Sequence, residues 1–163
     1  MLLKYLTIQR CKLLVFLTHQ FALPALKYVR KPKPFLYTKE QLHQLPNGSL
    51  GNDLIHFVEA KNLALLTHYA RHDLKHIVLG YDTTEEGELC LQSFMLGNGR
   101  ISIPVLATVF FGLLLAPEFW KKMYCSFLMG KQCNPIHQWD WFQMITQPTK
   151  EIQQKIFSLK KLI

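Results

Sequence analysis

The sequence is poor in charge and has no recognisable cysteine pattern. Charged residues make up 18% of its 163 residues and hydrophobic residues 49%, which predicts a folded globular protein with more apolar surface than usual. The four cysteines, Cys11, Cys90, Cys125 and Cys133, show no C-x-x-C spacing. Their arrangement argues against a cysteine zinc motif or a disulfide framework and favours a reducing compartment.

Acidic residues are absent from the first 39 positions, which hold eight Lys or Arg residues; the first carboxylate is Glu40. The remaining chain has eleven basic and eleven acidic residues, so the net charge of +8 comes from this N-terminal quarter. A basic and apolar segment suits an anionic membrane surface. Nucleic acid is the other polyanion, but no binding motif accompanies the charge, so we predict no nucleic-acid partner.

The N-terminal segment has three interpretations. A structural or membrane-contacting helix is favoured, and a cleaved mitochondrial targeting peptide is the second reading because the segment lacks acids. A secretory signal is the weakest, because His19 and Gln20 interrupt the apolar run Leu13–Leu17.

A long uninterrupted hydrophobic run is also missing. The most apolar stretch, Ile101 to Ala116, has 16 residues and contains Ser102, Pro104 and Thr108. It is too short for a clean membrane span. We expect a buried helix or the wall of a groove for a lipid tail.

Convincing strand patterns are absent, and the chain predicts an all-α, single-domain multi-helix bundle. Residues 1–40 are expected to form a basic amphipathic helix (2–23) and an extended linker (31–37), and residues 41–163 a helical domain. Capping boxes are expected at Thr38 with Gln41 and at Thr83 with Glu86, and a helix end at Gly80. The expected helices of the domain cover residues 52–60, 64–79, 84–96, 102–115, 117–129, 136–145 and 148–161.

Two histidines at helical spacing carry the strongest chemical signal. A helix places His72 and His76 on one face, one turn apart, which is also why H-E-x-x-H binds zinc. His76 is about 6 Å from the helix end at Gly80, and Glu88 is about 6 Å into the helix that starts at Thr84. A short loop favours antiparallel pairing, which would return Glu88 to the level of His76. The sequence therefore predicts a metal site on a helical hairpin.

Asp73 is open to two interpretations. On a helix it lies about 100° from His72 and about 60° from His76, so it either ligates from the side or accepts the N–H of a ligating imidazole. Two His and one or two carboxylates suit Zn²⁺ with an open position, and equally the set used by non-haem iron enzymes. His68 is expected to be a polar residue on the same face. Arg71 and Lys75 are expected on a solvated face, with steering of an anionic headgroup as the alternative.

The string His72-Asp73-x-x-His76-x11-Glu88 resembles the signature of the ubiquinone (coenzyme Q) biosynthesis Coq-four family. Leu45-Pro46-x-Gly48-Ser49-Leu50-Gly51 resembles the family's turn before the metal helix, and Leu79-Gly80 with Thr84 and Gly87-Glu88 its following segment. Softer similarities lie at Ile103-Pro104, Phe111-Gly112 and Trp139 to Gln147. The resemblance covers about residues 42–145.

The resemblance implies an all-α protein on the membrane face where coenzyme Q is made. That face is cytoplasmic in a bacterium and the matrix side of the mitochondrial inner membrane in a eukaryote. It implies association with other quinone-biosynthesis proteins, a divalent metal (zinc first, with Fe²⁺ the alternative) and His72, Asp73, His76 and Glu88 as ligands and catalytic residues. The implied enzyme activity is removal of the ring C1 carboxyl group, with or without oxidation, from a polyprenylated hydroxybenzoate.

Two departures from the family pattern keep alternatives open. The stretch from Asn62 to His72 is shorter than in typical members, and so is the N-terminal region. A non-catalytic protein that binds a prenyl lipid or acts as a scaffold in a quinone-biosynthesis complex is therefore the competing function. A metal-dependent hydrolase is a third class, supported only by the helical histidine pair.

Overall fold

The computed structural model describes Arg10 and residues 33–158 of the chain. The expected helix 2–23, apart from Arg10, and the end of the expected helix 148–161 lie outside the described residues. Within residues 33–158 the regular structure is helical, and an isolated bridge between Ser49 and Pro148 is the β-type pairing found there. The prediction of an all-α fold is therefore confirmed for this part of the chain.

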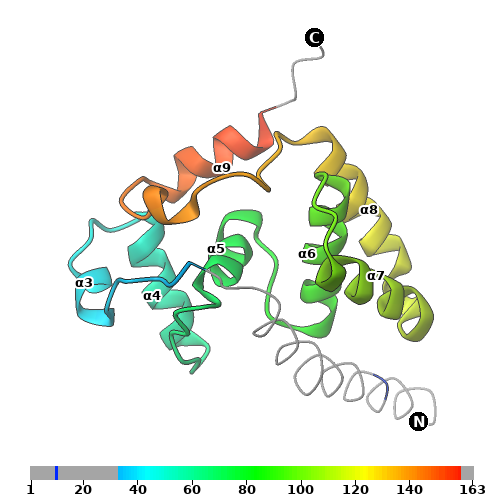
Figure 1. Cartoon of the computed structure of the whole chain (residues 1–163), viewed down its shortest axis with the longest axis horizontal. Helices are drawn as coiled ribbons and strands as arrows, with labels where there is room; N and C mark the ends of the chain where they lie inside the picture. The colour runs from blue at the N-terminus through cyan, green and yellow to red at the C-terminus, as the bar shows by residue number, and fades with distance from the viewer. Residues whose placement is uncertain (1–9, 11–32, 159–163) are drawn as a thin grey trace. The chain divides into compact units, whose positions relative to one another are not determined.

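The described helices fall into two compact units. The split unit combines Lys33–Tyr81 with the described residues from Gln132 onward, and the three-helix unit is Asp82–Lys131. The split unit contains α3 (Lys39–His43), α4 (Leu50–Ala60), α5 (Ala70–Leu79), the 3₁₀ helix η3 (Trp141–Met144) and α9 (Thr149–Phe157). The three-helix unit contains α6 (Glu85–Gly97), α7 (Ile103–Leu115), the 3₁₀ helix η2 (Pro117–Phe119) and α8 (Trp120–Gln132) (Figure 1).

The turn before α4 ties the two chain segments of the split unit together. Gly48 has a φ of 77°, a conformation that favours glycine. Ser49 caps α4 by accepting the N–H of Asn52. The carbonyl of Gly48 accepts the N–H of Thr149, and the N–H of Gly51 donates to the carbonyl of Ile145. The Leu45–Gly51 motif is thus a scaffold that joins α4 to the start of α9.

The segment assigned to a linker is partly built into the split unit. Residues 33–38 form no helix or strand, but Phe35 is buried and its N–H donates to the carbonyl of Thr67. The capping box of Thr38 and Gln41 is confirmed at the start of α3.

Two predicted helices differ from the structure. The predicted helix 64–79 begins only at Ala70, since residues 63–66 have no regular structure and residues 67–69 form a turn. The expected helix 136–145 is a turn followed by η3. Its backbone carbonyls at His137 and Trp139 accept hydrogen bonds from the Arg71 guanidinium instead of from helical N–H groups.

Close helix contacts build the three-helix unit. A Cβ at Gly97 would collide with the carbonyl oxygen of Phe127, and one at Gly130 with that of Phe94, so α6 and α8 approach backbone to backbone. The amide of Asn98 donates to the carbonyl of Gly130 at 3.0 Å. A small core of Leu89, Ala116 and Met123 lies between the three helices.

The start of α6 corrects the predicted capping box at Thr83 and Glu86. The N-cap is Thr84, which accepts the N–H of Gly87. The Asp82 carboxylate fixes this register because it accepts both the N–H and the hydroxyl of Thr84. The capping residue therefore lies one position later than the sequence pattern suggested.

Of the two expectations for the apolar stretch 101–116, the buried helix is wrong. Of α7, only Val105 and Gly112 are buried, and most of its large side chains are exposed. Among the described residues no single helix is long and apolar enough to span a membrane. Ile103–Leu115 and Pro117–Gln132 meet that test only when taken together, across a bend of 106°.

Candidate metal centre

The α5 helix places His72 and His76 on one face, as their spacing predicted. The two ring centroids lie 4.7 Å apart with an interplanar angle of 63°. His76 is buried, with 1% of its surface exposed, whereas the His72 side chain is 35% exposed. One imidazole is thus held within the protein and the other borders solvent.

The orientation of His76 is fixed by the end of its own helix. Gly80 takes the left-handed conformation predicted for a helix end, and the chain then turns so that Nδ1 of His76 lies 3.1 Å from the carbonyl oxygen of Tyr81. Because a carbonyl only accepts, Nδ1 is the donor in this hydrogen bond. Metal-ligating histidines commonly have their second ring nitrogen held by a backbone carbonyl in this way. The ring of Phe57 stacks on His76 with centroids 6.3 Å apart.

Glu88 belongs to the three-helix unit, in the first turn of α6 after Thr84. Its N–H donates to the carbonyl of Thr84, so the cap that starts α6 also sets its position. The sequence motif pairs this carboxylate with His72 and His76 of α5 as a candidate ligand set for a metal ion. Two imidazole nitrogens and one carboxylate fit a divalent zinc or iron ion by donor chemistry.

Asp73 follows His72 directly on α5. Its Oδ1 lies 3.7 Å from Nδ1 of His72, and its side chain is 18% exposed. That distance is too long for a hydrogen bond, but it places the carboxylate beside the His72 ring. Of the two interpretations left open by the sequence, this arrangement favours the outer position, next to a ligand.

Three residues near the pair differ from their predicted settings. His68 lies in a turn before α5 and is exposed, so it does not share the helical face. Lys75 is 7% exposed and therefore does not lie on a solvated face. Arg71 donates to the carbonyls of His137, at 3.3 Å, and Trp139, at 3.1 Å. Sequence reasoning missed this anchoring role, because its partners lie more than sixty residues away along the chain.

Comparison with known proteins agrees with the motif. The model of the family described as "Coenzyme Q (ubiquinone) biosynthesis protein Coq4" matches residues 53–160. The chain belongs to the Coq4 family. The matched region includes His72, Asp73, His76 and Glu88 and most of both units, which confirms the resemblance seen in the sequence.

A solved structure supports the fold. It is described as a "Putative ubiquinone biosynthesis protein" from Nostoc punctiforme PCC 73102, and it is 24% identical to this Coq4-family chain with a TM-score of 0.57. The similarity covers 91% of this chain and 81% of that one. A comparison with the curated proteins gives no match.

Proposed function

We propose that this member of the Coq4 family is a metal-dependent enzyme of coenzyme Q biosynthesis. The reaction we propose is removal of the C1 carboxyl group, with or without oxidation at that carbon, from a polyprenylated hydroxybenzoate. The observation that carries the proposal is the histidine pair of α5: the rings of His72 and His76 lie 4.7 Å apart, and the Tyr81 carbonyl orients the buried His76 as the backbone orients many ligating histidines. Family membership supplies the pathway.

In this proposal His72, His76 and Glu88 hold the ion and Asp73 orients His72. A bound divalent cation would supply Lewis acidity toward a phenolate or carboxylate. The protein's own contribution is to fix the ligands. The Tyr81 carbonyl and the Phe57 ring hold His76 before any ion binds, so less ordering is required at the moment of binding. Zinc and ferrous iron both fit this donor set.

Glu88 is the proposed ligand that belongs to the three-helix unit, whereas both histidines belong to the split unit. Five residues, Gly80 to Thr84, separate the end of α5 at Leu79 from the start of α6 at Glu85. A connection of that length reaches at most about 20 Å even when fully extended. Such a short connection supports the assignment of Glu88 to the same ligand set as the two histidines.

The proposed setting is a membrane surface on the side where coenzyme Q is made, with other quinone-biosynthesis proteins as partners. Polyprenylated substrates are confined to lipid, so a peripheral location gives the enzyme access to them. The basic N-terminal quarter supports this location by its charge.

Metal analysis of three matched variants tests the site. We expect purified protein to carry one equivalent of zinc or iron, and His72→Ala and Glu88→Gln to lose most of it while the far-ultraviolet circular dichroism is unchanged. His68→Ala is the control, because this histidine is exposed and lies outside the helix. Protein without stoichiometric metal, or Glu88→Gln that keeps its metal, would contradict the ligand set.

The competing function is a non-catalytic protein that binds prenyl lipid or acts as a scaffold. It is favoured by the exposed apolar surface of α7. It predicts that His72→Ala and Glu88→Gln keep lipid and partner binding and that no turnover is found with a polyprenylated hydroxybenzoate. Turnover by the parent protein that disappears in both variants would decide for the enzyme.

A further inference from the structure

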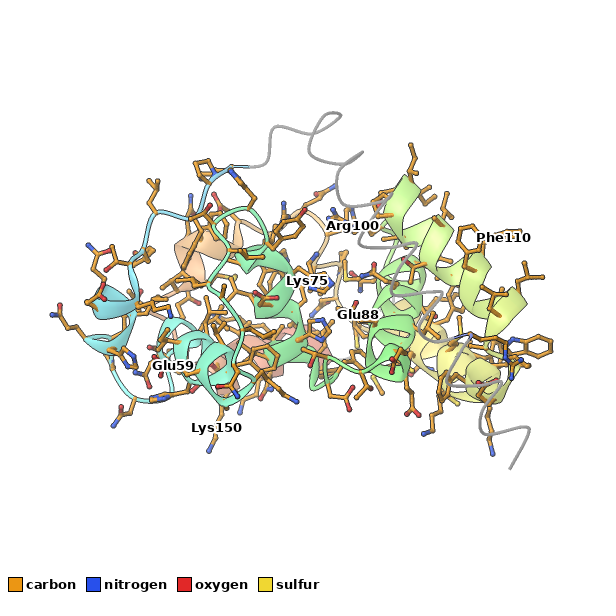
Figure 2. All side chains as sticks on the ribbon, turned by 90° about the horizontal axis from the view of Figure 1, so that it is seen from below. Glu59, Lys75, Glu88, Arg100, Phe110 and Lys150 are labelled. Carbon is orange, nitrogen blue, oxygen red and sulfur yellow. The ribbon has the colours of Figure 1, made fainter. Side chains whose placement is uncertain are left out.

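The outer face of α7 is a continuous apolar surface. Ile103, Leu106, Phe110 and Leu114 follow one another at spacings of three or four residues, so they share one side of the helix. Their exposed fractions are 77%, 45%, 62% and 64%. The opposite side holds Gly112, where a Cβ would meet the side chains of Leu89 and Met123. Figure 2 shows Phe110 on the side of α7 that faces away from α6.

The α8 helix extends this surface around the bend. Trp120, Tyr124 and Leu128 recur every four residues and are 50%, 62% and 36% exposed. The indole Nε1 of Trp120 donates to the carbonyl of Leu113 at 2.9 Å, which joins the end of α7 to the start of α8. We call the exposed side chains at Ile103, Leu106, Phe110, Leu114, Trp120, Tyr124 and Leu128 the apolar corner.

The chain segment that forms the apolar corner carries more positive than negative charge. Residues 101–132 contain three lysines and one acid, Glu118. Lys122 pairs with Glu86 at 2.6 Å. Lys121 is exposed, and the Lys131 ammonium lies 6.0 Å from the ring centroid of Phe127. Lysines at the edge of an apolar face can keep the ammonium in a polar layer while their stems cover apolar surface.

From these observations we propose that the apolar corner binds the surface of an anionic lipid bilayer. Leucine, isoleucine and phenylalanine would enter the acyl boundary, and Trp120 and Tyr124 would lie at the headgroup level, where amphipathic rings are enriched. Lys121 and Lys131 would meet the lipid phosphates. The α7 helix has 13 residues, a length of about 20 Å against a hydrocarbon core of about 30 Å. The corner therefore lies in one leaflet rather than crossing the membrane.

Membrane binding by the apolar corner does not require the metal site. The sequence predicted membrane contact at the basic N-terminal segment, whereas the apolar corner lies far along the chain from it. A lipid bilayer is favoured over a protein partner because the corner combines a contiguous apolar face with cationic edges. Protein interfaces are instead depleted in lysine.

Quenching by brominated lipid gives a readout local to the corner. The full chain has three tryptophans, Trp120, Trp139 and Trp141, and only Trp120 belongs to the corner. We expect vesicles of brominated phosphatidylcholine and phosphatidylglycerol to quench the fluorescence of the parent protein. Trp120→Phe should lose most of that quenching while it still sediments with the vesicles. Equal fractional quenching of parent and Trp120→Phe would overturn the proposal.

Sedimentation with vesicles tests the face itself. The double variant Phe110→Gln/Leu114→Gln should bind phosphatidylglycerol-containing vesicles about tenfold more weakly or worse, with unchanged circular dichroism and metal content. The matched control is Leu36→Gln, because Leu36 is 81% exposed in the split unit; it should bind like the parent. Lys121→Gln should weaken binding about fivefold to anionic vesicles and leave binding to pure phosphatidylcholine unchanged.

Two further outcomes would refute the proposal. Undiminished binding of the double variant would place the lipid contact elsewhere, with residues 1–32 the first alternative. A parent protein that is dimeric by analytical ultracentrifugation, becomes monomeric in the double variant and binds no vesicles in either form would identify the corner as an interface between two copies. Loss of metal in His72→Ala with normal vesicle binding would separate this proposal from the proposed enzyme activity.

Discussion

The two units use similar apolar side chains in opposite ways. In the split unit, Leu50, Leu54, Ile55 and Val58 of α4 are fully buried. In the three-helix unit, α7 is the more apolar helix by sequence, yet only Val105 and Gly112 of its residues are buried. Hydrophobicity alone therefore does not decide burial. The split unit buries the apolar side chains of α4 against neighbours that include α5, the helix of the histidine pair, whereas the three-helix unit leaves most of those on α7 exposed.

The largest expected effect on the free energy of unfolding comes from replacing a buried leucine of α4 with alanine, compared with the same replacement of an exposed leucine of α7. Leu54 is 0% exposed and Leu114 is 64% exposed. Leu54→Ala should lower the free energy of unfolding by about 2–5 kcal/mol, because it removes buried methyl groups and leaves a cavity. Leu114→Ala should change it by less than about 0.5 kcal/mol. Urea titration monitored by circular dichroism measures both.

These two variants make the comparison between the units falsifiable. A large loss for Leu114→Ala would mean that α7 is covered in the folded chain in solution. The apolar corner would then be part of a core, and the difference between the units would disappear. A loss for Leu54→Ala below about 1 kcal/mol would contradict the tight packing of α4.

A smaller effect is expected at the start of α6, where the three-helix unit begins. Thr84→Ala removes the side chain that accepts the N–H of Gly87 and should cost about 1 kcal/mol. Thr83→Ala is the matched control and should cost almost nothing, because the structure assigns the cap to its neighbour. The measurement is again the free energy of unfolding in urea. Equal losses at both positions would restore the sequence-based capping box at Thr83.

Signals confined to a few neighbouring residues could be predicted from the sequence. The spacing of His72 and His76, the helix end at Gly80 and the capping box at Thr38 each depend on contacts within one or two turns. The family match over residues 53–160 confirms the resemblance to which the histidine pair and Glu88 pointed. These signals were enough to find the candidate ligands.

Features decided by distant contacts could not be predicted. The segment 136–140 reads as a helix, but the Arg71 guanidinium, 66 residues before His137, takes the carbonyls that a helix would use. The register of α6 depends on Asp82, since either Thr83 or Thr84 satisfies the local capping pattern. The burial of Lys75 and the exposure of Phe110 depend on which faces the surrounding helices cover, and periodicity does not report this.

The smallest predicted effect concerns the surface of the split unit and is a pH dependence. The ammonium of Lys33 donates to Asp140 at 3.1 Å, and this hydrogen bond is the main reason that the pKa of Asp140 is lowered. A carboxylate with a lowered pKa in the folded state adds stability above its unfolded pKa, and that stability is lost as pH falls through the folded pKa.

Lys33→Met keeps the apolar stem and removes the charge, so it should lower the melting temperature slightly at pH 7. The difference from the parent should shrink below about pH 4, where aspartate is protonated. Because both side chains are largely exposed, added salt should also reduce it at pH 7. Thermal melts of both proteins across this range check the sign. A difference that grows as pH falls would show that Lys33 stabilises the split unit through something other than its pairing with Asp140.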